Sequence, residues 1–145
     1  MAAQVTLEID LSGWKHCLDR VHAGIDQIPT IEIGPRDVEN RLKAQDSFDR
    51  GDMTYPLSGE AKKAGGSMLA RGLKAVAHGD PPGKMHEVML RVGENCTRDI
   101  KKQIQSGAVE GPARSPGWIA RKGNDINMLG LTGDFIRSLT SKPVK

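Results

Sequence analysis

The chain has 145 residues, of which 37% are hydrophobic, 3% aromatic and 27% charged, with a formal net charge of +3. This length allows one hydrophobic core, and two Trp, one Tyr and two Phe are too few for a surface that stacks bases on several aromatic platforms. No apolar run approaches the roughly 20 residues that span a bilayer, and the amino terminus lacks a secretory signal pattern. We expect a single domain over residues 1–145, in the cytoplasm and without a membrane partner.

Positive charge is concentrated toward the carboxyl terminus. From residue 114 onward six Lys and Arg residues stand against two Asp residues, which gives +4, and the preceding residues sum to −1. A basic tail is compatible with phosphate or with an acidic protein surface, although charge alone usually reflects solubility. The two cysteines, Cys17 and Cys96, both fall within apolar helical patterns. We interpret them as reduced core residues.

The first elements expected in chain order are a strand and a helix. Residues 4–11 alternate between apolar and polar side chains, which is the period of a half-buried strand. Ser12 is a candidate N-cap, and Pro29 would end the helix that follows. The apolar residues of that helix recur at helical spacing at Trp14, Cys17, Leu18, Val21, Ile25 and Ile28. A short extended segment is expected at 30–33.

Two helical segments are expected next. Gly34-Pro35 would open a weak one, in which Val38 and Leu42 form a narrow apolar stripe. Ser58 would cap a second, whose apolar residues are Ala61, Ala64, Met68, Leu69, Leu73 and Val76. Gly65 and Gly66 would each weaken this helix by roughly 1 kcal/mol relative to Ala, unless close packing against a neighbour explains them.

The clearest periodicity predicts a helix over residues 84–106. Its apolar residues repeat at intervals of three and four at Met85, Val88, Met89, Val92, Cys96, Ile100 and Ile104. Glu87 lies early, Lys101 and Lys102 lie late, and Gly107 is suited to end the helix.

Beyond residue 107 the helical period disappears. Gly, Pro, Ser, Asn and Arg dominate about two dozen residues, and we expect an extended loop or arm over 107–131. Irregular segments of this length inside a small domain are normally functional. The following residues, Thr132-Gly133-Asp134, are typical of a cap that opens one short turn through Ser138, with Phe135 and Leu139 available for packing.

The sequence offers no convincing catalytic, metal or cofactor site. His16 and His22 are six residues apart, so their side chains do not converge as an i, i+4 pair would, and no second His or Cys cluster completes a tetrahedral site. Nucleophile-elbow and phosphate-cradling glycine motifs are also missing. We therefore predict a binding or assembly protein and no enzyme. A small enzyme or toxin that uses His78 or His86 is a weaker hypothesis.

The last third of the chain carries a specific resemblance. A helix ending Ile104-Gln105-Ser106-Gly107 leads through a proline-bearing loop to Ala120-Arg121-Lys122-Gly123, and then to Leu129-Gly130-Leu131-Thr132-Gly133 and Phe135-Ile136-Arg137-Ser138-Leu139. Over about residues 88–140 this order resembles the carboxyl-terminal region of small virion morphogenesis proteins of tailed bacteriophages, which act in the neck or in tail completion. The resemblance implies an α+β protomer. Together with the elements above, this means a small antiparallel sheet packed with three to four amphipathic helices and a long irregular arm.

The resemblance also implies a structural virion protein, assembled in the host cytoplasm. Copies would form a ring of six or twelve around the DNA channel between portal and tail, contacting other neck, portal or tail proteins. The genome would pass through the lumen without specific binding, since many phosphate contacts would retard it. In a head-to-tail ring each protomer uses two different surfaces, and an arm laid over the neighbour extends the contact.

Within this picture we predict interface residues in and after the arm. Trp118 and Ile119 would be apolar anchors, although Trp118 could equally fold back on its own core. Lys122, Arg121 and Arg137 would face the channel or an acidic partner, or else form a solvated surface. The complete predicted interface set is Trp118, Ile119, Arg121, Lys122, Thr132, Gly133, Phe135 and Arg137.

An alternative function is that of a basic nucleic-acid-binding accessory protein. Its motivation is the basic tail, with Arg114, Arg121 and Lys122 around Trp118. This hypothesis predicts DNA binding with a steep salt dependence, whereas the assembly hypothesis predicts weak binding or none.

Overall fold

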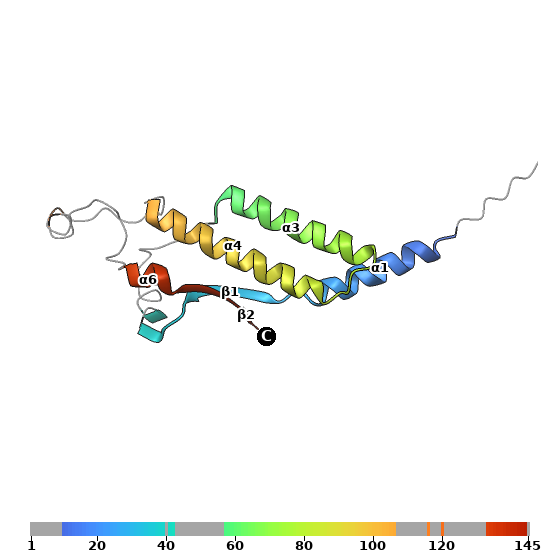
Figure 1. Cartoon of the computed structure of the whole chain (residues 1–145), viewed down its shortest axis with the longest axis horizontal. Helices are drawn as coiled ribbons and strands as arrows, with labels where there is room; N and C mark the ends of the chain where they lie inside the picture. Colours follow the sequence, from blue (N-terminus) through green and yellow to red (C-terminus); the bar gives the residue numbers. More distant parts are fainter. Residues whose placement is uncertain are drawn as a thin grey trace, which may run out of the picture.

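The computed structural model describes residues 10–39, 41–42, 57–106, 116, 120 and 133–144. Its elements, in chain order, are α1 (Ser12–Ile25), β1 (Thr30–Pro35), α3 (Gly59–Ala77), α4 (Lys84–Ser106), α6 (Gly133–Ser138) and β2 (Leu139–Val144). The fold is α+β, as expected: α3 and α4 form a long antiparallel hairpin, α4 lies on a two-stranded antiparallel sheet, and α1 occupies one end (Figure 1). The predicted arm at 107–131 lies outside the described residues, apart from Pro116 and Ala120.

Helix α4 is the centre of the fold, and the predicted range of 84–106 is confirmed. Its apolar face packs against α3 on one side and against both strands on the other. The buried hydrophobic side chains of the described residues are Val76, Met85, Val92, Cys96, Ile100, Ile104 and Leu139. Val88 and Met89, also predicted on this face, are half-buried. Five of the seven buried side chains therefore come from α4 alone.

Helix α3 begins as the sequence predicts. The Ser58 side chain accepts a hydrogen bond from the Ala61 backbone N–H at 3.0 Å, which satisfies one of the free donors of the first turn. Gly65 and Gly66 differ in role. Gly65 is buried, and a Cβ there would lie 3.3 Å from Val92 Cγ1, whereas a Cβ at Gly66 would meet nothing within 4 Å. Close packing against α4 thus explains the first glycine and not the second.

The sheet has one covered and one exposed face. Strand β1 pairs with β2 in the register Thr30 to Val144 and Pro35 to Leu139. Gly93 of α4 sits directly on the covered face, where a Cβ would lie 2.8 Å from Ile31 Cγ2. The sequence predicts an extended segment at 30–33, and the observed strand continues to Pro35. No sequence pattern predicts β2.

The strand predicted over residues 4–11 is absent at Asp10 and Leu11, the two of its residues that the structure describes. Asp10 and Leu11, the last two residues of the predicted strand at 4–11, adopt neither strand nor helix, and residues 4–9 lie outside the described part of the chain. The strand that β1 pairs with is β2, near the carboxyl terminus, and the pairing places buried Leu139 opposite Pro35.

Helix α1 has different ends from those predicted. Ser12 is its first helical residue and not its N-cap; Asp10 accepts a hydrogen bond from the Ser12 backbone N–H at 2.9 Å. The helix ends at Ile25, four residues before Pro29, since a turn stabilised by Gln27 N–H to Gly24 O intervenes.

The helix predicted to open at Gly34-Pro35 also starts later. Both residues complete β1, and the Arg36 N–H donates to Ser138 O at 2.8 Å, which continues the pairing toward α6. Helical backbone begins at Val38. Proline is tolerated at this position because a two-stranded sheet consists only of edge strands.

Candidate assembly interface

The predicted interface residues fall mostly outside the described residues. This holds for Trp118, Ile119, Arg121, Lys122 and Thr132, and for Arg114 of the nucleic-acid hypothesis. Gly133 and Phe135 belong to α6, which begins at Gly133 as the sequence predicts and packs against β1. Arg137 is an exposed residue of the same helix. The structure therefore brings three of the eight residues together, on one short helix.

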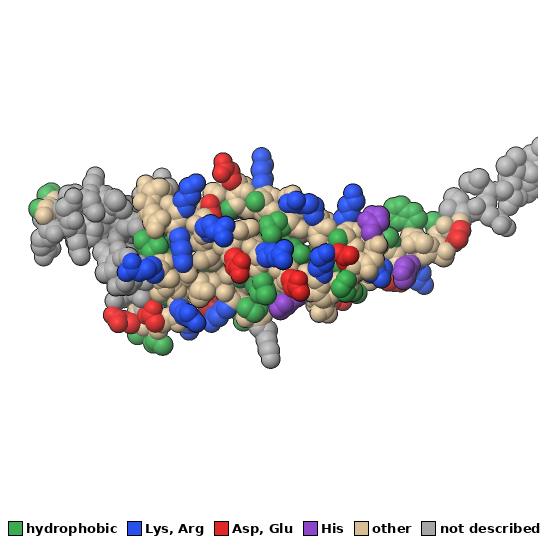
Figure 2. All heavy atoms as spheres, in the orientation of Figure 1, with side chains coloured by type: hydrophobic (Ala, Val, Ile, Leu, Met, Phe, Trp, Pro, Cys, Tyr) green, Lys and Arg blue, Asp and Glu red, His purple; other side chains and the backbone are tan. Residues whose placement is uncertain are grey.

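The largest apolar feature of the described surface lies on α1. Leu11, Trp14, Leu18 and Ile25 are exposed by 62%, 71%, 51% and 46%. Their spacing of three, four and seven residues, with half-buried Val21 in between, places them in one line along the helix. We call these four residues the α1 row. In Figure 2 hydrophobic side chains gather over the end of α1 that projects beyond α3 and α4.

The start of this helix is held by an acidic side chain. The Asp10 carboxylate accepts from the Ser12 backbone N–H, and the hydrogen bonds from the Ser12 side chain and backbone lower the pKa of Asp10. A negative charge at this position also interacts favourably with the amino-terminal end of the helix dipole. The α1 row therefore begins on an ordered turn.

The adjacent face of α1 is fixed to the end of α3. Arg20 donates from Nε to Val76 O at 2.8 Å and from Nη2 to Asp80 O at 2.7 Å. The Cys17 thiol donates to Ala77 O at 3.4 Å. Val76 and Ala77 belong to the last turn of α3, whose carbonyl groups have no intrahelical partners. Because α1 is attached through this face, the α1 row points away from the protein body.

Both cysteines are free thiols, but only one is a core residue. Cys96 is 8% exposed, and Cys17 is half-buried between α1 and the end of α3. Burial, and secondarily the negative charge of Asp99, raises the pKa of the Cys96 thiol. A neutral buried thiol of this kind behaves as a small hydrophobic side chain.

A second exposed apolar patch lies after β1. Val38 is 70% exposed and Leu42 is 67% exposed, and their i, i+4 spacing puts them on one side of a helical turn. Arg41 ties this turn to the sheet through a hydrogen bond from Nε to Pro35 O at 3.0 Å. In Figure 1 the segment is the teal turn at lower left, at the opposite end of the molecule from α1. We call it the Val38–Leu42 patch.

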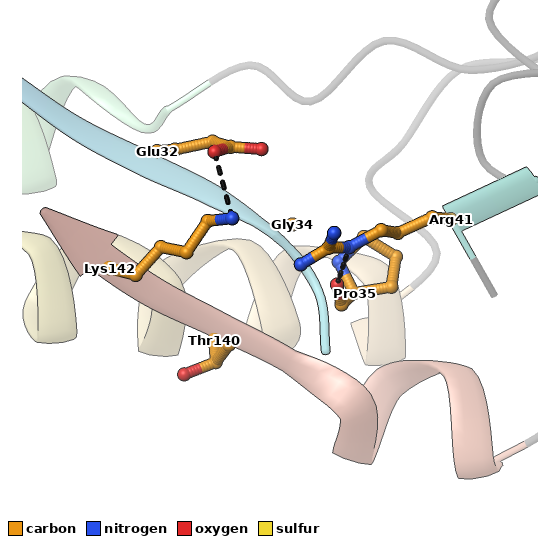
Figure 3. A pocket seen from close by; sticks show the side chains of 6 residues that line it. All are labelled: Glu32, Gly34, Pro35, Arg41, Thr140 and Lys142. Carbon is orange, nitrogen blue, oxygen red and sulfur yellow. Dashed lines mark hydrogen bonds and ion pairs between the residues drawn. The ribbon is translucent and has the colours of Figure 1, made fainter. Parts of the chain in front are cut away.

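The depression beside this turn is too small for a ligand. Figure 3 shows it on the exposed face of the sheet, where Lys142 Nζ and Glu32 Oε2 form an ion pair at 3.2 Å across the two strands. The remaining lining residues are Gly34, Pro35, Arg41 and Thr140. Its volume of about 10 Å³ holds no more than one water molecule.

A larger groove runs between α4 and β2. It is open, has a volume of about 330 Å³, and is lined by Glu94, Thr97, Arg98, Lys101, Leu139, Thr140 and Ser141. Thr97 is buried but already satisfied, because its hydroxyl donates to Gly93 O at 2.9 Å. The remaining charges of the groove are of both signs. It is a polar, solvent-filled surface with no convergent catalytic group.

The histidines do not form a site within the described ranges. His16, His22, His78 and His86 are all exposed. Among the described residues no group of three or more His, Cys, Asp or Glu side chains is arranged to hold a metal ion. Across those same ranges, no helix has both the length and the apolar character needed to cross a bilayer.

The sequence pattern places most of the α1 row on the core-facing side of the helix, whereas the structure exposes it. The helical spacing predicts one apolar face that contains Trp14, Leu18 and Ile25 together with Cys17. The structure divides that face in two: Cys17 and Gly24 contact the protein body, and the α1 row faces outward. Apolar residues recur at alternating intervals of three and four from Leu11 to Ile25, and this pattern is typical of a helix that packs against another helix.

Comparisons with protein-family models, with curated proteins and with solved structures found no match to this chain. The class that the described residues define is a small α+β protein with exposed apolar side chains at two ends.

Proposed function

We propose that this protein is a structural virion protein of a tailed bacteriophage, part of the neck or head-to-tail connector. Copies assemble as a ring around the DNA channel between portal and tail. The observation that carries the proposal is the α1 row, together with the motif resemblance over residues 88–140. Monomeric proteins rarely expose contiguous apolar patches larger than a few hundred Å², and such patches mark interaction surfaces.

The architecture supports an assembly role in a second way. Arg20 and Cys17 anchor α1 to α3, so the helix is ordered without using its most hydrophobic residues. Trp14, with 71% of its surface exposed, is the residue type that most often dominates interface energies. Because the helix is already ordered, it loses little conformational entropy when a partner binds.

Labelling of phage particles tests the proposal. Antibodies raised against the purified protein are applied to particles released from the host that encodes it, and gold-conjugated secondary antibody is located by electron microscopy. We expect gold at the junction of head and tail. Antibodies against the major capsid protein serve as a control and should label the head shell. Particles that bind the capsid antibody alone would contradict the proposal.

The nucleic-acid alternative is favoured by one observation. Lys and Arg side chains are scattered over α3 and α4, with fewer Asp and Glu among them (Figure 2). A fluorescence anisotropy titration with duplex DNA separates the two hypotheses. The connector function predicts weak binding that does not depend on sequence, whereas an accessory DNA-binding protein would bind tightly and lose affinity steeply between 50 and 200 mM salt, by about 10³-fold or more.

A further inference from the structure

We infer that an extended segment of another protein, with an acidic side chain in it, adds as a third strand to the free edge of β2, in the groove between β2 and α4. This contact goes beyond the proposed virion function and does not depend on it. It requires an unpaired strand edge, room beside that edge and a charge pattern that a partner can match. β2 and α4 supply all three.

One row of backbone groups on β2 is left unpaired by the sheet. In an antiparallel pair, residues that exchange backbone hydrogen bonds with the opposite strand alternate with residues that do not. The Arg36 N–H donates to Ser138 O, so in this register every second residue after Ser138 faces β1. The intervening residues, Leu139, Ser141 and Pro143, therefore direct their backbone groups away from β1. Proline has no N–H, and its place in this row costs the ladder no hydrogen bond.

Ser141 is the centre of this free edge. In the part of the chain that the structure describes, neither its backbone N–H nor its C=O has a hydrogen-bond partner. An unpaired edge is a template on which another chain can form a strand. In such strand addition the main-chain hydrogen bonds give affinity, and the side chains beside the edge give specificity.

Room for an added strand lies between β2 and α4. The open groove of about 330 Å³ has Leu139 and Ser141 on its β2 side and Thr97 among its α4 residues. A third strand would run about 4.8 Å from β2, and every second side chain of it would point toward α4. Leu139 is buried, and the Thr97 hydroxyl already donates to Gly93 O. Neither residue therefore needs a polar partner from the added strand.

The charges of the groove are arranged along its length. α4 and β2 run in opposite directions (Figure 1), and a Cβ at Gly93 would lie 3.2 Å from Ser141 Cβ. Glu94 therefore lies near Ser141, and Arg98 and Lys101 lie toward the start of β2. Among the described residues, none of these three charged side chains forms an ion pair. Two cations and one anion make the groove net positive, so a partner strand matches it with Asp or Glu facing the two cations.

Hydrogen exchange followed by NMR on the full chain identifies what occupies the edge. In the protein alone the Ser141 amide should exchange rapidly, whereas the Thr140 amide, which faces β1, should be protected. Protection of Ser141 in the dilute protein would mean that a segment of the same chain covers the edge. Protection that increases with protein concentration would mean that a second copy does. Either result would overturn the inference.

Selection from a library of random peptides supplies the probe. Peptides of about ten residues, the upper length of an ordinary strand, are selected on the full-length protein. Those that bind should carry Asp or Glu at a position an even number of residues from Lys or Arg, so that both side chains lie on one face. Adding the tightest peptide should slow exchange of the Ser141 amide by about tenfold or more.

Charge variants test the specificity of the groove. Arg98→Gln combined with Lys101→Gln should weaken binding of the selected peptide by about tenfold or more. Arg91→Gln combined with Lys63→Gln removes the same charge from exposed positions outside the groove and should leave the affinity unchanged. Circular dichroism and thermal unfolding establish that both variants are folded. Replacing the acidic residue of the peptide by its amide should weaken binding to the wild type and have little further effect on the Arg98→Gln, Lys101→Gln protein.

Three further results would contradict strand addition at β2. They are a selection that yields no binding peptide, peptides whose affinity ignores Arg98 and Lys101, and bound peptides that protect Ile31 or Ile33 on β1 while Ser141 still exchanges rapidly. Labelling of the junction of head and tail would survive any of these results, so the two proposals fail separately.

Discussion

Ser58 and Asp99 join the start of α3 to the carboxyl-terminal half of α4. The Asp99 carboxylate accepts from the Ser58 hydroxyl at 2.8 Å and from the Ser58 backbone N–H at 3.0 Å, while Gln103 donates to it at 2.7 Å. Ser58 is also the cap of α3. One carboxylate therefore orients the residue that starts the neighbouring helix, and the hairpin of α3 and α4 is fixed at the end away from its turn.

Replacing Asp99 should weaken this hairpin in a pH-dependent manner. Burial alone would raise the pKa of Asp99, but the hydrogen bonds from Ser58 and Gln103 outweigh it and lower the pKa below its ordinary value near 4. A lowered folded-state pKa adds stability that is present above about pH 4 and lost as the pH falls through the folded value. Asp99→Asn should therefore cost about 1 kcal/mol at pH 7.

Urea unfolding of wild type and Asp99→Asn at pH 7, 5 and 3 checks this prediction. The difference in unfolding free energy should shrink between pH 5 and pH 3. A double-mutant cycle with Ser58→Ala should show coupling, because both substitutions change the hydrogen bond from the Ser58 hydroxyl to the Asp99 carboxylate. A difference that stays constant with pH would show that the carboxylate charge is not what matters.

Two glycine substitutions should have opposite effects on stability. Gly93→Ala places a methyl group 2.8 Å from Ile31 Cγ2 and 3.2 Å from Ser141 Cβ, so it should separate α4 from the sheet and cost about 1–3 kcal/mol. Gly66→Ala meets nothing within 4 Å and should stabilise α3 by about 1 kcal/mol. Thermal unfolding of both variants gives the comparison. Equal effects would mean that α4 does not approach the sheet this closely.

The two thiols should differ in reactivity. Cys96 is buried and its pKa is raised, so little thiolate forms and it is reached only through local opening; Cys17 is half-buried. Iodoacetamide labelling followed by mass spectrometry should modify Cys17 faster, by on the order of tenfold or more. Unfolding in guanidinium is the control and should equalise the rates. Faster labelling of Cys96 in the folded protein would contradict this packing.

Arg20 should control whether α1 stays attached. Arg20→Met keeps much of the apolar stem but removes both hydrogen bonds to the carbonyls of Val76 and Asp80, at a cost of about 2 kcal/mol. Hydrogen exchange should become faster throughout Ser12–Ile25 while α4 remains protected. Arg71→Met, whose Nε makes only a 3.3 Å bond within its own helix, is the matched control. Unchanged exchange in α1 would mean that apolar packing alone holds the helix.

The long helices could be predicted because their information is local. Ser58 and the repeat from Met85 to Ile104 specify α3 and α4 without reference to the rest of the chain. The strand pairing could not be predicted in the same way. β1 is separated from β2 by more than one hundred residues, and its burial depends on Gly93 of α4, which no local pattern encodes.

The candidate interface illustrates a similar limit. Helical spacing places Trp14 and Cys17 on one broad apolar face, but spacing does not tell which part of that face contacts the protein itself. The deciding contacts are those of Arg20 with carbonyls 56 and 60 residues away. They orient α1 and so determine that Trp14 faces outward.

The number of copies of this chain in purified particles tests the connector function most directly. Quantitative mass spectrometry with isotope-labelled peptides compares it with the portal subunit in the same sample. We expect a fixed ratio that corresponds to one ring, of six or twelve copies for each portal ring. Particles that contain the portal subunit and none of this chain would contradict the proposed function.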